Sequence, residues 1–273
     1  MLSELPEGKE LPTGTPDLLA IREGVLGWLV LNQPDRRNAI SGAMWAAIPG
    51  AIAALAAEPE VRAIIIRGAG NEAFAAGADI SEFSENRQDS HAARAYEERN
   101  LAAFAAISGA SKPVIAMISG FCIGGGLAVA LACDLRIAAE NASFALPPAR
   151  LGLAYPLEGL RQLLAVVSPS VAKDMIFTAR RLAAAEALEL GLLNRMVAPK
   201  ALEGETRALA ALIAENAPLS IAAAKGMIGA LTSPDGPDRL AMQALAAQCF
   251  ESEDYREGQA AFLEKRKPRF SGR

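Results

Sequence analysis

Three consecutive glycines, Gly124–Gly126, stand where main-chain groups could hold a negative charge. The apolar run 113–118 predicts a buried strand before them, and a helix is expected to run from them to about Cys133. Glycine lets a ligand come close to the backbone, and the first amides of a helix lack internal partners and lie at the positive end of its dipole. Such amides can bind an anion or a developing oxyanion. Close packing of the helix on the strand would explain the same glycines.

A second stretch of small residues, Ala75–Ile80, follows the strand expected at Val61–Arg67. By itself it indicates only a tight connection. Just before it, Gly68–Ala73 matches the GxGxxA pattern of dinucleotide-binding folds, in which a helix opens at the phosphates. The residues that follow are typical of a loop, so a dinucleotide site is disfavoured.

Other common chemistries lack the residues that they need. The chain has a single histidine, His91, which nearly excludes His-centred metal sites and Ser-His-Asp catalysis. Three cysteines, Cys122, Cys133 and Cys249, are too few and too far apart for a disulfide framework or a zinc site. We therefore expect no metal and a reducing, cytoplasmic location. The net charge of -4 offers no broad basic surface for nucleic acid or an anionic membrane.

One uncharged run, Pro113–Cys133, has 21 residues and is long enough to cross a bilayer. Ser119, Gly120 and the triplet Gly124–Gly126 would break a continuous helix within it. A buried strand, a turn and a short buried helix account for the same apolarity, so no membrane segment is predicted.

The length of 273 residues suits a compact α/β domain, because strands and helices alternate to about residue 200 and helices alone follow. Three segments are expected: a flexible N-terminus at 1–16, an α/β core at 17–200, and a helical region at 201–273 whose apolar faces serve oligomerisation. Strands are expected at 18–21, 25–31, 61–67, 113–118 and 135–138, and helices after Ser41, at 91–107, 124–133 and 183–190, and as a pair split near Pro169.

Taken together, several motifs resemble the crotonase (enoyl-CoA hydratase/isomerase) superfamily, in the family's order along nearly the whole chain. The resemblance implies a spiral of ββα units with a helical C-terminal appendage, trimers or dimers of trimers, and acyl-CoA thioester substrates. Coenzyme A would be bound as part of the substrate, with no permanently bound cofactor. The matching stretches are Leu31–Ala39, Phe74–Ile80, Lys112–Ala116, Gly124–Gly126, Cys133–Asp134 and Ala187–Asn194.

The same resemblance assigns site residues. The two amides of an oxyanion hole fall on Ala78 and Gly125, and would stabilise the thioester oxygen of an enolate. The carbonyl of Ala76 would meet the adenine of CoA, and the stretch around Arg36 and Arg37 would lie near the CoA phosphates. Further CoA contacts fall on Ala39, Asp79, Ile80, Gly124, Phe262 and Lys265. The last two resemble a C-terminal segment that often acts across a subunit boundary, although a solvated tail explains its charges equally.

Two positions depart from the family. Its hydratases use two glutamates to manage water and a proton, and these positions hold Ala128 and Pro148 here. Neither side chain titrates, and lost acid–base catalysis typically costs 10²–10⁴-fold per group. Efficient hydration is therefore not expected, and the isomerase base, also at Pro148, is missing as well.

Local stretches resemble methylmalonyl-CoA decarboxylase instead: the loop Leu151–Gly159 and the tail Glu251–Pro268. The pocket tyrosine of that enzyme falls on Tyr155, and its pocket histidine falls on Ala78, so half of the signature is absent. Decarboxylation forms an enolate without a base, and Tyr155 could orient or protonate it. A core tyrosine is the alternative for Tyr155. The charged residues that flank it, Arg150 and Glu158, are more typical of surface salt bridges.

These observations favour an acyl-CoA lyase that stabilises a thioester enolate, and the missing glutamates favour a decarboxylase-like reaction. A weak or specialised enoyl-CoA hydratase is an alternative. A non-catalytic acyl-CoA-binding protein that kept the pocket and lost the acids is an alternative of another class.

Overall fold

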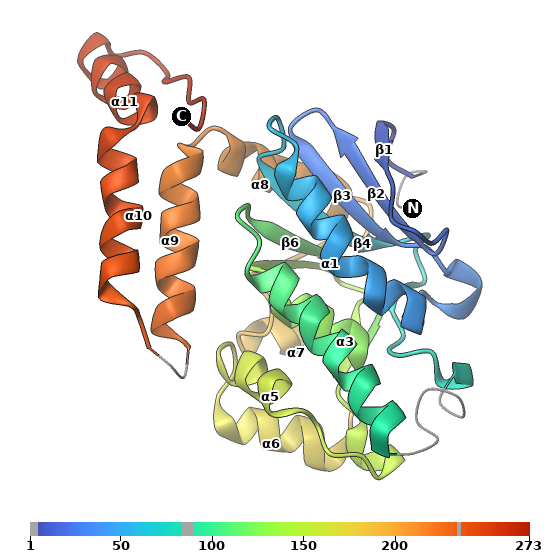
Figure 1. Ribbon diagram of the computed structural model, residues 1–273. Coiled ribbons are helices and arrows are strands. Elements are labelled where there is room, and N and C mark those ends of the chain that lie inside the picture. The colour runs from blue at the N-terminus through green and yellow to red at the C-terminus, as the bar shows by residue number, and fades with distance from the viewer. Residues whose placement is uncertain (1–4, 83–89, 234–235) are drawn as a thin grey trace.

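Two sheets run through the core of the protein, whose computed structural model describes residues 5–82, 90–233 and 236–273 (Figure 1). The large sheet contains, in spatial order, β1 (Lys9–Leu11), β2 (Leu18–Glu23), β3 (Leu26–Leu31), β4 (Ala63–Gly68), β6 (Val114–Ile118), β8 (Leu135–Ala139) and β11 (Arg195–Val197). The small sheet contains β10 (Leu182–Ala183), β9 (Ser143–Ala145), β7 (Phe121–Ile123) and β5 (Ala73–Ala75). From β3 to β11 the large sheet is parallel, and β1 and β2 extend it by antiparallel pairing.

Helices cover both faces of the large sheet, which explains why β4 and β6 are buried along their whole length. On one face lie α1 (Gly42–Ala57), α3 (Ser90–Ser108) and α4 (Gly125–Ala132). On the other lies α8 (Leu202–Ala214), whose Leu202 and Ala210 pack against the sheet. Ser41 begins α1 as expected, because its hydroxyl accepts a hydrogen bond from the Met44 amide.

The chain winds as a spiral of ββα units, as the family resemblance implies. Each turn adds one strand to the large sheet, one to the small sheet, and then a helix. The turns are β4, β5 and α3; β6, β7 and α4; and β8, β9 and α5 (Leu157–Leu164). The short strands were not expected from the sequence: Phe121–Ile123 lies where a glycine turn was predicted, and pairs with β5 and β9 instead.

The N-terminal segment also differs from its expectation. Within residues 1–16, predicted to be flexible, Lys9–Leu11 form β1 and pair with β2, so that Lys9 lies opposite Arg22. The Lys9 ammonium also forms an ion pair with Glu58 at the end of α1. Within the described ranges, no helix is both long enough and apolar enough to cross a membrane.

The last part of the chain is helical, as expected. After α6 (Pro169–Thr178), α7 (Ala184–Glu189) and β11, it forms α8, α9 (Pro218–Leu231), α10 (Arg239–Glu251) and α11 (Glu253–Glu264). In Figure 1, α9 and α10 lie side by side and, with α11, form an arm beside the sheets. This arm leaves large apolar side chains exposed, among them Leu231, Leu240, Phe250 and Phe262.

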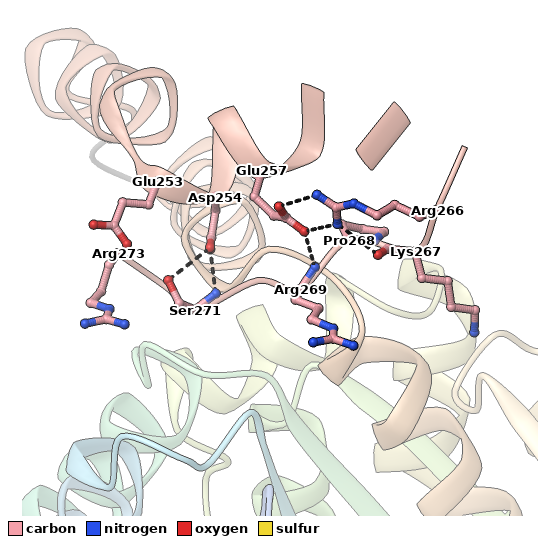
Figure 2. Close-up of a pocket in the computed structure, with 9 residues that line it drawn as sticks. All are labelled: Glu253, Asp254, Glu257, Arg266, Lys267, Pro268, Arg269, Ser271 and Arg273. Atoms are coloured by element: carbon pink, nitrogen blue, oxygen red, sulfur yellow. Dashed lines mark hydrogen bonds and ion pairs between the residues drawn. The ribbon is translucent and has the colours of Figure 1, made fainter. Parts of the chain in front are cut away.

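The chain after α11 turns back along that helix. Asp254 accepts hydrogen bonds from the amides of Ser271 and Gly272. Figure 2 shows the bond from Ser271, and also shows Glu257, which accepts a hydrogen bond from the Arg269 amide and pairs with the Arg266 guanidinium. These bonds fix the C-terminal residues against the arm.

Asn38 holds together the loop between β3 and α1. Its buried amide accepts a hydrogen bond from the Gln33 amide at 3.1 Å and donates to the carbonyls of Ala69 and Ala73 at 2.9 and 2.7 Å. Its backbone is left-handed, with φ of 55°. Asparagine tolerates that conformation better than most residues.

Replacing Asn38 with alanine is expected to lower the free energy of unfolding by about 2–4 kcal/mol, because two buried carbonyls lose their donor and alanine is strained at this φ. Urea denaturation at fixed protein concentration measures the loss. Asn38→Gly removes the backbone strain but does not restore the lost hydrogen bonds. It should therefore recover only part of the free energy of unfolding that Asn38→Ala loses. Full recovery by glycine would show that the amide contributes nothing.

Candidate active site

Ile40 and Ala78 form an isolated parallel β-bridge, and this bridge sets the direction of the Ala78 N–H. The Ile40 amide donates to the Gly77 carbonyl at 2.8 Å, and the Asp79 amide donates to the Ile40 carbonyl at 3.0 Å. Because successive residues of an extended chain face opposite sides, the N–H of Ala78 points away from this pairing. It donates no hydrogen bond within the part of the chain that the structure describes.

The second amide comes from the start of α4. Gly124 caps this helix with φ of 53° and ψ of -117°, a conformation that essentially only glycine adopts. Gly125 is the first helical residue, so its N–H has no acceptor inside the helix. A Cβ atom added to Gly125 would lie 3.4 Å from the Ala78 nitrogen. Gly125 therefore lies next to the Ala78 amide, as the predicted oxyanion hole requires.

The three glycines serve different purposes. Gly124 provides the positive φ, and Gly125 keeps the space beside the two amides open. A Cβ atom on Gly126 would lie 2.4 Å from the Ala75 carbonyl oxygen, so this glycine allows α4 to pack closely on β5. Close packing therefore explains Gly126, whereas binding of an anion at Gly125 stays a prediction.

A cavity of about 320 Å³ opens beside the two amides. Five of the residues expected from the sequence line it: Ala76, Ala78, Gly124, Gly125 and Tyr155. The other expected residues do not line it; these are Arg36, Arg37, Ala39, Asp79, Phe262 and Lys265, together with Ile80, whose side chain lies outside the described part of the structure. Phe262 and Lys265 belong to α11 and the residue after it, and no residue of the arm contributes to the described lining.

Comparison with known proteins gives the family. The model of the enoyl-CoA hydratase/isomerase family matches residues 21–273. The chain belongs to this family. Similar proteins include a short-chain-enoyl-CoA hydratase of Clostridium acetobutylicum, 35% identical over 90% of this chain and 94% of that protein. A crotonyl-CoA hydratase of Syntrophomonas wolfei is 35% identical over 93% and 97%. A solved structure of an enoyl-CoA hydratase/carnithine racemase from Magnetospirillum magneticum superposes with a TM-score of 0.90, at 35% identity over 95% of this chain and 97% of that one.

In this enoyl-CoA hydratase/isomerase family member, no carboxylate stands at the two positions that the resemblance matches to the hydratase glutamates. Ala128 on α4 and Pro148 at the start of the 3₁₀ turn Pro148–Leu151 both line the cavity. Glu97 on α3 is the one carboxylate among the described lining residues, and it is exposed to solvent. The described lining contains no lysine or arginine.

Tyr155 contributes a buried polar atom to this family member's cavity. Its ring lies along α5, where a Cβ atom on Gly159 would meet Tyr155 Cε1 at 2.7 Å. Its hydroxyl is buried and has no hydrogen-bond partner among the described residues. Burial, and to a smaller extent the neighbouring Cys122 thiol, raises the pKa of Tyr155 above its usual value, so the hydroxyl stays protonated.

Two charged neighbours of Tyr155 in the sequence lie elsewhere. Glu158 forms an ion pair with Arg161 on the same helix, and Arg150 is exposed. Neither residue lines the cavity, which agrees with their interpretation as surface charges.

Sequence reasoning missed two polar lining residues on α3, Glu97 and Asn100. Asn100 Oδ1 is buried without a partner, again within the described chain. The signal was present, because Glu97, Asn100, Leu101 and Phe104 follow helical spacing and share one face, and polar residues on such a face are unusual.

The arginines assigned to CoA by resemblance lie next to the loop that carries Ala76. The Ala76 amide donates to the Arg37 carbonyl at 2.9 Å. The Arg37 guanidinium pairs with Glu72 at 2.6 Å and lies 5.2 Å from the centre of the Phe121 ring. More than half of its side chain is exposed, so an anion can compete with Glu72 for it.

Arg36 is held more firmly, by the buried carboxylate of Asp79 at 2.6 Å. Burial acts to raise the pKa of Asp79, but hydrogen bonds from Ser81 and Arg36 outweigh it and hold that pKa below its usual range. Asp79 directly follows Ala78 in the chain. Its ionised carboxylate therefore holds Arg36 next to the loop that contains Ala78.

CoA binding is expected to depend on salt and on Arg37 and Lys265, because the phosphates are anionic and the net charge of -4 gives no general attraction. Arg37→Ala and Lys265→Ala should each raise the Kd of CoA about fivefold, or about 1 kcal/mol. Titration calorimetry at two salt concentrations measures this, with the exposed Arg195→Ala as the control. An unchanged Kd for Lys265→Ala would remove that residue from the site.

Proposed function

We propose that this family member is an acyl-CoA lyase that stabilises a thioester enolate with the amides of Ala78 and Gly125, and that it forms the enolate by decarboxylation. The observation that carries the proposal is the cavity wall. The cavity lining contains Ala78 and Gly125, and it also contains Ala128 and Pro148, the residues that the family resemblance matches to the two hydratase glutamates. Decarboxylation needs the two amides and not the glutamates.

The reaction would use groups that the cavity provides. The thioester oxygen of a malonyl-type CoA accepts hydrogen bonds from both amides. The bond between the α-carbon and the carboxylate breaks, its electron pair forms the enolate, and CO₂ leaves. A proton then adds to the α-carbon. Two fixed backbone donors stabilise the enolate without reorganising, and loss of one such donor in other enzymes costs about 3 kcal/mol.

The apolar wall also favours loss of the carboxylate. The described lining contains no lysine or arginine that would stabilise the substrate carboxylate, and Ala128, Pro147 and Pro148 add apolar surface to it. An ionised carboxylate is poorly solvated among apolar groups, whereas CO₂ is not, so the step relieves an unfavourable burial. Tyr155 is the proposed proton donor, because its hydroxyl is protonated and unpartnered within the described residues.

Hydration of a 2-enoyl-CoA is the second candidate, and one observation favours it. Glu97 lines the cavity and could act as a base toward water. Relatives named short-chain-enoyl-CoA hydratase and crotonyl-CoA hydratase support it as well. Against it, Glu97 is exposed and is the one carboxylate in the described lining, whereas the family's hydratases divide the work between two.

Parallel assays with a malonyl-type CoA and with crotonyl-CoA separate these candidates. We expect release of CO₂ from the first and little hydration of the second, with Glu97→Gln changing neither. Efficient crotonyl-CoA hydration that Glu97→Gln abolishes would establish the second candidate. Binding of both thioesters without turnover would instead identify an acyl-CoA-binding protein.

Assembly of several copies is part of the proposal. The exposed apolar side chains of α9, α10 and α11, Phe250 and Phe262 among them, support a trimer or a dimer of trimers. In such an assembly Lys265 would act on the cavity of a neighbouring copy. We expect the protein to work in the cytoplasm.

A further inference from the structure

The cavity has an open and a closed end. Leu151 and Leu153, on the loop before α5, are 50% and 39% exposed and mark the side open to solvent. Trp45, Ala128 and Phe104 are 1%, 3% and 5% exposed and mark the closed end. A group that enters from the exposed side of the lining therefore meets Trp45 and its two neighbours where the lining is most buried.

Trp45 is fixed by two buried aromatic residues of α3. Its indole Nε1 donates a hydrogen bond to the Tyr96 hydroxyl at 3.0 Å. Its ring meets the Phe104 ring edge to face, with centroids 5.5 Å apart and planes at 86°. Tyr96 is as deeply buried as Trp45. The indole therefore cannot turn aside without breaking a buried hydrogen bond and an aromatic contact.

The same indole borders the space between the two amides. A Cβ atom on Gly125 would lie 3.0 Å from Trp45 Cζ2 and 3.4 Å from the Ala78 nitrogen. A thioester oxygen bound by both amides lies about 3 Å from each nitrogen. The first carbons of the acyl group then lie beside the six-membered ring of Trp45.

We propose that Trp45 determines acyl-group specificity and restricts the enzyme to short acyl chains. The proposal rests on the proposed binding of the thioester at Ala78 and Gly125. Protein interiors are close-packed, so a longer chain could be accommodated only by displacing the fixed indole. One methylene too many in such a pocket typically costs 10–200-fold in selectivity.

The test measures binding of saturated acyl-CoAs, which neither decarboxylate nor add water, so it does not depend on the reaction. Kd values of propionyl-, hexanoyl- and decanoyl-CoA are measured by calorimetry for the wild type and for Trp45→Ala. The wild type should prefer propionyl-CoA over decanoyl-CoA. Trp45→Ala should bind decanoyl-CoA at least tenfold more tightly than the wild type, with the Kd of free CoA unchanged.

Two further variants keep the result interpretable. Trp45→Phe removes less volume and should shift selectivity in the same direction by a smaller factor, which covers the case that the alanine variant does not fold. Ile52→Ala removes a buried side chain from the same helix, away from the cavity lining, and should leave the selectivity of the wild type.

The possible results distinguish the role of Trp45 from the proposed function. An unchanged ratio of the decanoyl-CoA to propionyl-CoA Kd in both Trp45 variants would overturn the role of Trp45, whatever the reaction. Failure of the wild type to bind any of the three thioesters would overturn the proposed function, and the inference with it. A changed ratio in a protein without decarboxylase activity would leave Trp45 in its role and remove the proposed reaction.

Discussion

Replacing Gly125 with proline is expected to lower kcat by about 10²–10³-fold in a protein that still folds and assembles. Proline has no N–H, so it deletes one of the two donors that flank the space beside Ala78. Gly125 is the first residue of α4, and proline is well accepted at that position because the lost N–H makes no bond inside the helix.

Gly125→Ala is the matched control, because it adds a side chain but keeps the N–H. Its Cβ atom would lie 3.0 Å from Trp45 Cζ2, so the indole must give way by a few tenths of an ångström. We expect a much smaller loss of kcat than with proline. Circular dichroism and sedimentation check folding and assembly of both variants. Equal losses in both would attribute the effect to crowding, and a folded proline variant with the kcat of the wild type would exclude Gly125 from the oxyanion hole.

The second large effect is expected at Tyr155. Tyr155→Phe should lower kcat by about 10²-fold with little change in CoA affinity, if the hydroxyl delivers or orients the proton. The hydroxyl has no partner among the described residues, so its removal breaks no internal hydrogen bond. The variant should therefore be at least as stable as the wild type, because a buried unpaired hydroxyl is lost.

The pH profile distinguishes this role further. Burial raises the pKa of Tyr155 above the ordinary value of about 10. A donor is active below its pKa and inactive above it, so kcat should show no loss attributable to Tyr155 up to about pH 9. If Tyr155→Phe has the same kcat as the wild type, Tyr155 serves only in packing and another group is the proton source.

Several elements could be predicted because local chemistry defines them. Three elements lie where expected: β6, α1 and α4. An apolar run predicts the first, a capping serine the second and a glycine turn the third. The strands β5, β7 and β9 carry no such local signal. Each has three residues and is stabilised by neighbours more than 20 residues away in the chain, so no local pattern predicts it.

The cavity shows the same division. Its main-chain groups follow from the two small-residue stretches, whereas the spacing around Trp45 indicates ordinary core packing, and the spacing around Asn100 indicates a polar position on a helix face without showing what that face meets. Their place in the cavity depends on how α1 and α3 pack over α4, which is a tertiary property. Arg36 and Arg37 were expected near the ligand, and only the structure provides their partners, Asp79 and Glu72.

The donors at Ala78 and Gly125 belong to the main chain, and this has a consequence for evolution. A substitution at either position other than proline changes the shape of the cavity but leaves the N–H in place. The proposed charge-stabilising part of the site is therefore robust to mutation, and a change of side chain at Ala128 or Pro148 leaves both N–H groups in place. A lineage can then lose the acids of one reaction while it keeps stabilisation of the enolate, and selection can act on a different reaction of the same intermediate.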